Sequence, residues 1–267
     1  MRHGRRARLL LFALAWLVGL FLLLPGLITI PVSLNASRFI AMPKDGLSLR
    51  HFVELFSGAG WLDSMGQSAV IAAVVTAASV LLGTACAIGL WRLAGRLAVL
   101  ISAVVLTPMI LPAIVSGLAL YRMWVVLGLY DSWLGVVIAH AILALPFVVI
   151  TVTTSLSMLD PRLEQAARSL GATPRTTAWR VILPNIKAGV FTGAVFAFVT
   201  SWDEVVVTLF VSSRAVYTLP RRMWDGIREN IDPTVTAVAT LLIAATSIVV
   251  AGALVQMLRR PRPARAT

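Results

Sequence analysis

Residues 133–156 read WLGVVIAHAILALPFVVITVTTSL, a run of 24 residues without Asp, Glu, Lys or Arg. About 20 apolar residues are enough for a helix to cross the ~30 Å hydrocarbon core of a bilayer. Lipid offers the backbone no hydrogen-bond partner, so a spanning segment must be a helix or a barrel strand. Barrel strands are about 10 residues long and alternate strictly between apolar and polar side chains. The run is longer and largely apolar throughout, and it therefore predicts a transmembrane helix.

Five further segments have the same character. The whole chain is 59% hydrophobic and 13% charged, whereas a soluble domain carries about 25% charged residues. We predict an all-α fold, a polytopic transmembrane helical bundle of about six spans in a single domain over residues 1–267. The predicted spans are residues 9–32, 67–91, 97–127, 133–156, 188–212 and 235–258.

The basic residues predict the orientation. Fifteen Lys and Arg residues lie at the two termini and in the loops on the same side, and eight lie in the other loops. By the positive-inside rule, both termini are cytoplasmic. The net charge of +12 does not indicate nucleic-acid binding, because the charges lie in short segments between apolar runs. A basic start before span one is also typical of a signal peptide, but residues 9–32 exceed its 7–15-residue apolar core, which favours an uncleaved anchor.

The loop between spans four and five, residues 157–187, carries signals for two short helices. Asp160-Pro161 is typical of a helix start, with Asp as the N-cap and Pro at the first helical position. Gly171 is placed to end that helix in a left-handed conformation. Thr173-Pro174 repeats the start signal, and Pro184 is expected to stop the second helix. This pattern fits an interfacial hairpin on lipid headgroups or a surface that docks another protein.

The same loop resembles the signature loop of ABC-importer permeases, which reads Glu-Ala-Ala, three residues, Gly, nine residues, Ile, one residue, Leu-Pro. The spacing matches throughout, and the matching residues are Gln165, Ala166, Ala167, Gly171, Val181, Leu183 and Pro184. The resemblance covers most of the chain and is strongest to permeases of spermidine/putrescine importers. Further resembling stretches are residues 107–117, 156–184, 201–206, 217–220 and 232–240.

The resemblance implies a single permease domain whose loop forms the coupling helix that sits in a groove of the ATPase subunit. Two residues depart from the family pattern, because Gln165 replaces Glu and Val181 replaces Ile. Glu164 is therefore an alternative source of the acidic contact with the ATPase. The implied partners are a cytoplasmic dimer of ATP-binding subunits, a second permease that we expect to be a different chain, a periplasmic solute-binding protein and membrane lipid. No cofactor is expected in this chain, because ATP and Mg would bind in the partner subunits.

Asp203 and Glu204 are the only acidic residues well inside a predicted span. A charge at the centre of a spanning helix costs about 2.5–3.5 kcal/mol or more, so such residues face protein or water. Adjacent helical positions differ by about 100°, so the two carboxylates can share one direction only if the helix opens locally. Trp202 precedes them, and carboxylates beside an aromatic ring suit an amine cation. These three residues are candidates for the substrate path, and the alternative is a buried acid hydrogen-bonded to a neighbouring span or subunit.

Proline, histidine and glycine residues mark other features of the spans. Pro108 and Pro112 predict a kinked or opened span three, as a wall of the pathway or as a simple packing kink. His140 is the only histidine within a predicted span, and we expect it to hydrogen-bond between helices. Gly189 and Gly193 permit close packing of helices.

The predicted function is that of a permease subunit of an ATP-driven importer of a small solute, with a polyamine or other cationic amine as the expected cargo. The transport mechanism implied by the family is alternating access. The chain is not expected to be an enzyme or to hold a metal, since it has neither an ATP-binding Gly-x-x-x-x-Gly-Lys-Ser/Thr loop nor a zinc-binding His-Glu-x-x-His pattern. The alternatives are an importer permease for an amino-acid-like compound or an organic anion, and a stand-alone secondary transporter.

Overall fold

The computed structural model describes residues 2–44, 46–58, 60–93, 95–229 and 231–259. Arg260, Arg262 and Arg265, which contribute to the predicted orientation, lie outside this part of the chain. The described residues divide into two compact units. Unit 1 comprises residues up to 62 and from 223 onward, and unit 2 comprises residues 63–222. The single domain over residues 1–267 stays a prediction.

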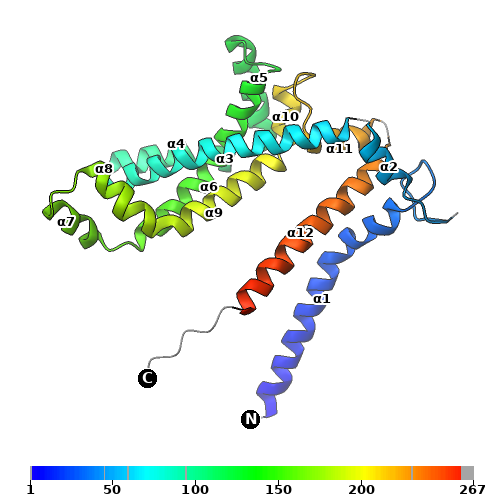
Figure 1. The fold of residues 1–267 in the computed structure, drawn as a ribbon, viewed down its shortest axis with the longest axis horizontal. Coiled ribbons are helices and arrows are strands. Elements are labelled where there is room, and N and C mark those ends of the chain that lie inside the picture. The colour runs from blue at the N-terminus through cyan, green and yellow to red at the C-terminus, as the bar shows by residue number, and fades with distance from the viewer. Residues whose placement is uncertain (1, 45, 59, 94, 230, 260–267) are drawn as a thin grey trace. The chain divides into compact units, whose positions relative to one another are not determined.

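Unit 1 contains two long apolar helices, α1 (Arg2–Ser33) and α12 (Thr234–Arg259). They lie side by side (Figure 1), and the short helix α2 (Arg50–Ser57) packs on α12. The apolar side chains of α1 are largely exposed; Trp16, for example, is 78% exposed. Exposed apolar surface of this extent along a helix that long suits lipid as its surroundings.

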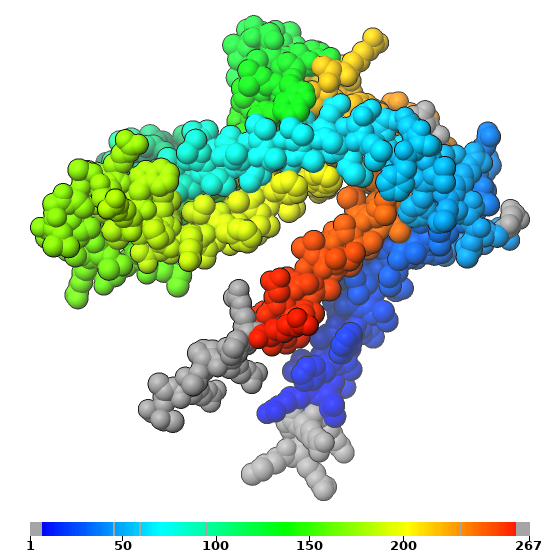
Figure 2. All heavy atoms as spheres, in the orientation of Figure 1, coloured from blue at the N-terminus to red at the C-terminus, as the bar shows by residue number. Residues whose placement is uncertain are grey.

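Unit 2 is organised around α6 (Trp133–Ser157). This helix contains the whole apolar run of residues 133–156 that the sequence predicts as a transmembrane helix. The other long helices of this unit are α3 (Trp61–Arg92) and α9 (Leu183–Trp202). Space-filling spheres show α3 as a continuous ridge on one face of the unit (Figure 2). A Cβ added to Gly193 of α9 would lie 2.7 Å from Thr151 Oγ1 of α6, and one added to Gly189 would lie 2.7 Å from the Thr151 carbonyl oxygen. The predicted close packing at these two glycines is confirmed.

Predicted span three is not one helix, because it breaks at Leu111-Pro112 into α4 (Arg96–Ile110) and α5 (Ala113–Leu127). The two helix axes are bent by 106°. Pro112 lacks an N–H and disfavours helical backbone at the residue before it, and Leu111 is accordingly extended with ψ 138°. The structure therefore has four helices long and apolar enough to span a membrane among the described residues, or six spans if each of two bent pairs counts as one.

Predicted span five, residues 188–212, also differs in the structure. Its main helix, α9, begins earlier and ends at Trp202, and a separate short helix, α10 (Val206–Val211), follows. The expectation that Pro184 stops the preceding helix is wrong. Helix α8 (Pro174–Thr177) continues through the π-helical turn η1 (Ala178–Ile182) into α9, where Pro184 lies in the first turn and its missing N–H is tolerated. The axis instead bends by 76° between segments 174–185 and 187–202.

Candidate functional site

Helix α7 (Pro161–Ser169) forms as the local sequence predicts. The Arg162 N–H donates to Asp160 Oδ1 at 2.9 Å, so Asp160 caps the first turn, and Pro161 occupies the first helical position. Thr173 caps α8 in the same way, because its side chain accepts a hydrogen bond from the Thr176 N–H. Two capped starts on either side of a tight turn give residues 160–177 a defined shape rather than that of a loose connection.

Gly171 ends α7 in the left-handed conformation, with φ +82°. The Gly171 N–H donates to the Arg168 carbonyl at 2.9 Å, and the Ala172 N–H donates to the Ala167 carbonyl at 3.0 Å. These two bonds make the Schellman motif, which satisfies carbonyls at the end of a helix. Glycine is favoured here because an L side chain is strained at this φ.

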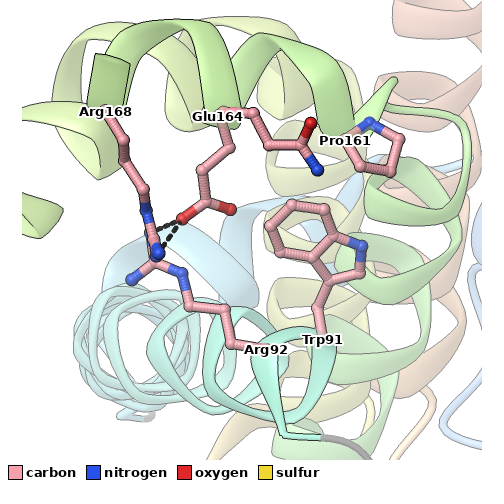
Figure 3. Close-up of a pocket in the computed structure, with 6 residues that line it drawn as sticks. Trp91, Arg92, Pro161, Glu164 and Arg168 are labelled. Atoms are coloured by element: carbon pink, nitrogen blue, oxygen red, sulfur yellow. Dashed lines mark hydrogen bonds and ion pairs between the residues drawn. The ribbon is translucent and has the colours of Figure 1, made fainter. Parts of the chain in front are cut away.

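The Glu164 side chain points from α7 toward Arg92 at the end of α3 (Figure 3), and the residue is 8% exposed. Its Oε1 atom lies 2.9 Å from an Arg92 guanidinium nitrogen and 2.8 Å from one of Arg168. Trp91, Arg92 and Pro161 line a pocket of about 280 Å³ beside this cluster, together with Glu164, Gln165 and Arg168. The carboxylate therefore fixes α7 against the end of α3, and its geometry does not favour the direct ATPase contact suggested from the sequence.

The other residues of the signature pattern differ in exposure. Gln165, Ala166, Gly171 and Pro184 are exposed, and Ala167, Val181 and Leu183 are half-buried. Two apolar side chains on the same segment are also open to solvent, since Leu163 is 45% and Leu170 is 89% exposed.

The acidic pair lies at the break between α9 and α10, so the helix is opened locally at residues 203–205. Asp203 is exposed, and the described residues supply no side-chain hydrogen bond or ion pair to its carboxylate. Glu204 is half-buried, and its Oε1 accepts the Val207 N–H at 2.7 Å. The two acids thus have different positions: Glu204 closes the first turn of α10, and Asp203 remains open.

Trp202 is the last residue of α9 and is half-buried. Its ring stacks on that of Phe198, with centroids 5.8 Å apart and an interplanar angle of 17°. One face of the indole is therefore covered by a side chain of its own helix.

A tight cluster at Asp131 was not predicted from the sequence. Asp131 adopts φ 54° in the turn before α6, and its Oδ1 accepts the N–H groups of Ser213, Arg214 and Ala215 at 2.7, 2.9 and 3.0 Å. Burial raises the pKa of this carboxyl, but the three N–H bonds and the Ser212 hydroxyl together lower it below its usual value. The partners lie more than 80 positions away in sequence, and no local pattern connects them.

In the described part of the chain, no group of three or more His, Cys, Asp or Glu side chains lies close enough together to hold a metal ion.

Residues 79–262 match the family described as "Binding-protein-dependent transport system inner membrane component". The chain belongs to this family. It is the permease subunit of an ABC importer and a multi-pass protein of the inner membrane, as the sequence predicted.

The permease has curated relatives that cover most of its length. It is 31% identical to the putrescine transport system permease protein PotI of Escherichia coli K12, over 86% of this chain and 84% of the relative. It is 30% identical to the spermidine/putrescine permease protein PotC of the same strain, over 86% and 87%. It is also 32% identical to the molybdenum transport permease protein ModB of Mycobacterium bovis, over 80% and 88%.

A solved structure shares the fold. The permease superposes on a chain of a bacterial ABC transporter involved in the import of the acidic polysaccharide alginate, with a TM-score of 0.69 and 16% identity. The match covers 95% of this chain and 97% of that chain. The predicted all-α transmembrane architecture is thereby confirmed.

Proposed function

We propose that this permease imports a polyamine or another small cationic amine, that it does so by alternating access, and that ATP hydrolysis in partner subunits drives the cycle. The observation that carries the substrate class is Asp203, an open carboxylate at a helix break within an apolar segment. A carboxylate in such a position is costly unless it faces water or a cation. An ammonium group can pair with the Asp203 carboxylate, and ammonium groups are also attracted to aromatic rings such as that of Trp202.

The proposed coupling surface is the α7 segment. Its capped start, its Schellman end at Gly171 and the exposed Gln165 and Ala166 give a rigid element with a small-residue contact face. Leu170, 89% exposed, adds apolar area. We propose that this element docks in the ATP-binding subunit and lies on the cytoplasmic side together with both termini. The half-buried Ala167, Val181 and Leu183 would set its shape, and Glu164 would hold it against α3.

We further propose that the complete importer contains a second permease of different sequence, two ATP-binding subunits that hold ATP and Mg, and a periplasmic solute-binding protein. We expect the four long helices of the described residues, or six spans if bent pairs are counted, to form half of a pathway. The PotI and PotC relatives support a polyamine cargo. The ModB relative supports an alternative cargo related to molybdenum, which in water is an oxyanion. Asp203 argues against an anion, because two negative charges at one site repel.

The test is uptake by the complete importer in proteoliposomes loaded with ATP, measured with labelled putrescine and separately with molybdate. The expected result is putrescine uptake that falls about tenfold for Asp203→Asn, because a hydrogen bond to a charged group contributes about 1.5–3 kcal/mol. Asp63→Asn, an exposed acid in the first turn of α3, is the matched control and should leave uptake unchanged.

Two results would contradict the proposal. Uptake of molybdate with no uptake of putrescine would replace the amine by an anion as the cargo. Equal putrescine uptake by the Asp203→Asn and Asp63→Asn variants would remove Asp203 from the path.

A further inference from the structure

His140 joins the two helices on either side of the break at residues 203–205. It lies in the first half of α6 and is 1% exposed. Its Nδ1 lies 3.0 Å from the Ser201 hydroxyl near the end of α9, and its Nε2 lies 2.9 Å from the Thr208 hydroxyl in α10. Ser201 and Thr208 are also buried. One imidazole therefore spans the gap from which Asp203 projects.

The donors and acceptors in this network have a single consistent direction. The Thr208 hydroxyl donates its only proton to the Glu204 carbonyl at 3.1 Å, so toward His140 it must accept. The tautomer assigned from this hydrogen bond has the ring proton on His140 Nε2 and makes Nδ1 an acceptor for the Ser201 hydroxyl. The chain of hydrogen bonds runs from Ser201 through His140 and Thr208 to the Glu204 carbonyl.

The break needs such a network because an opened helix leaves backbone groups without their usual partners. Lipid cannot satisfy these groups, so side chains or neighbouring helices must do so. The Glu204 carbonyl receives the Thr208 hydroxyl, and the Glu204 carboxylate receives the Val207 N–H at 2.7 Å. His140 holds Thr208 and Ser201 in place on the two helices and so fixes the separation between them.

We propose that His140 is a positioning residue that holds the 203–205 break in one geometry and thereby sets the exposure of the Asp203 carboxylate to the water-filled path. The exposure of Asp203 to the path rests on the proposed function. The hold of His140 on Ser201 and Thr208 follows from the two distances and does not depend on the identity of the cargo.

The experiment measures the accessibility of position 203 without any transported substrate. The chain has one cysteine, Cys86, so a Cys86→Ala background with Asp203→Cys carries a single thiol. Its rate of reaction with a cationic, water-soluble methanethiosulfonate is measured in the assembled importer in proteoliposomes. We expect His140→Leu to change this rate about fivefold, because a buried hydrogen bond contributes about 1 kcal/mol.

Three further variants separate positioning from general destabilisation. Thr208→Val should change the rate in the same direction, and in the variant that carries both His140→Leu and Thr208→Val the combined effect should be smaller than the sum of the two single effects, because both substitutions remove the His140–Thr208 bond. His140→Gln carries an amide near the position of Nε2 and should retain part of the parent rate. Thr192→Val is the control, because the Thr192 hydroxyl bonds to the Ala188 carbonyl of its own helix; the reaction rate of this variant should equal the parent's.

The inference is overturned if His140→Leu and Thr192→Val both react at the parent rate. Should the leucine variant fail to assemble, the comparison of Thr208→Val and His140→Gln with Thr192→Val decides in the same way. This experiment and the uptake test can fail separately. If His140→Leu changed the thiol reactivity while Asp203→Asn left putrescine uptake unaltered, the amine path would be contradicted and the positioning role of His140 would be supported.

Discussion

Glu164 of α7 and Arg92, the last residue of α3, are joined by an ion pair of 2.9 Å between Oε1 and a guanidinium nitrogen. The Arg92 and Glu164 side chains are 29% and 10% exposed, so solvent screens this pair only in part. The ion pair therefore links α7 to the end of a long apolar helix. Arg168 contacts the same carboxylate oxygen at 2.8 Å, so Glu164 has two guanidinium partners.

Removing the Glu164 charge should loosen α7. We expect Glu164→Gln to lower the stability of α7 against local opening by about 1–3 kcal/mol, because the carboxylate hydrogen-bonds to two guanidinium groups. Hydrogen exchange over residues 161–169 measures this. Arg162→Gln, an exposed arginine of the same helix, serves as the control. Effects of Arg92→Gln and Glu164→Gln that simply add in the double variant would argue that the two residues do not interact.

Gly171 should be sensitive to any side chain that resists a left-handed backbone. Gly171→Leu is expected to cost about 1–2 kcal/mol at φ +82°, and to reduce both uptake and its coupling to ATP hydrolysis while membrane insertion survives. Asn tolerates this conformation better than Leu, so Gly171→Asn should retain most coupling. Normal coupled uptake in the leucine variant would be incompatible with the coupling role of this turn.

The contact of α9 with α6 should tolerate no enlargement. Gly193→Leu is expected to destabilise the permease by about 1–3 kcal/mol or more, because the added side chain meets Thr151 and Val148. Gly89→Leu on α3 is the control, since no atom lies within 4 Å of a Cβ there. Thermal aggregation of the detergent-solubilised protein measures the difference. Equal aggregation temperatures for Gly193→Leu and Gly89→Leu would contradict the close contact between α9 and α6.

Asp131 should give a pH-dependent contribution to stability. Its pKa is lowered in the folded chain, so the stabilisation is complete above the unfolded value of about 3.9 and is lost as pH falls through the lower folded pKa. Asp131→Asn accommodates the left-handed φ but weakens three bonds to N–H groups, at a cost of about 1–2 kcal/mol.

Proteolysis at residues 212–215 reports the opening of this loop. The parent protein should become more susceptible only below about pH 4, whereas Asp131→Asn should be more susceptible at neutral pH and should show little further change on acidification. A parent protein whose cleavage rate rose already between pH 7 and pH 5 would contradict the assignment to Asp131.

Local signals in the sequence were sufficient for the α7 turn and for the long helices. Asp160, Pro161 and Gly171 act within a few residues of themselves, so their capping roles could be predicted from order alone. The break at Leu111-Pro112 was marked by its proline, yet the size of the bend depends on packing and was not predictable. The family assignment followed from the spacing of the signature loop and was confirmed by the family match.

Contacts distant in sequence were beyond the sequence analysis. His140 was expected to bond between helices, and this is confirmed, but its partners Ser201 and Thr208 lie 61 and 68 residues away. Glu164 was placed among the ATPase contacts because it could supply the charge that Gln165 lacks; that role stays a prediction, and the ion pair with Arg92 was not predictable from the sequence. Asp203 and Glu204 are adjacent and chemically alike, and only the α10 cap separates their roles.

The central claim is that α7 docks in the ATP-binding subunit, and site-directed photocross-linking tests it most directly. A photoreactive amino acid is placed at Gln165 in the complete importer, and the cross-linked subunit is identified by mass spectrometry. We predict an adduct with the ATP-binding subunit from position 165 and none from position 213, which we place on the opposite side of the membrane. An adduct from 213 instead of 165, or adducts of 165 with the solute-binding protein, would contradict the account.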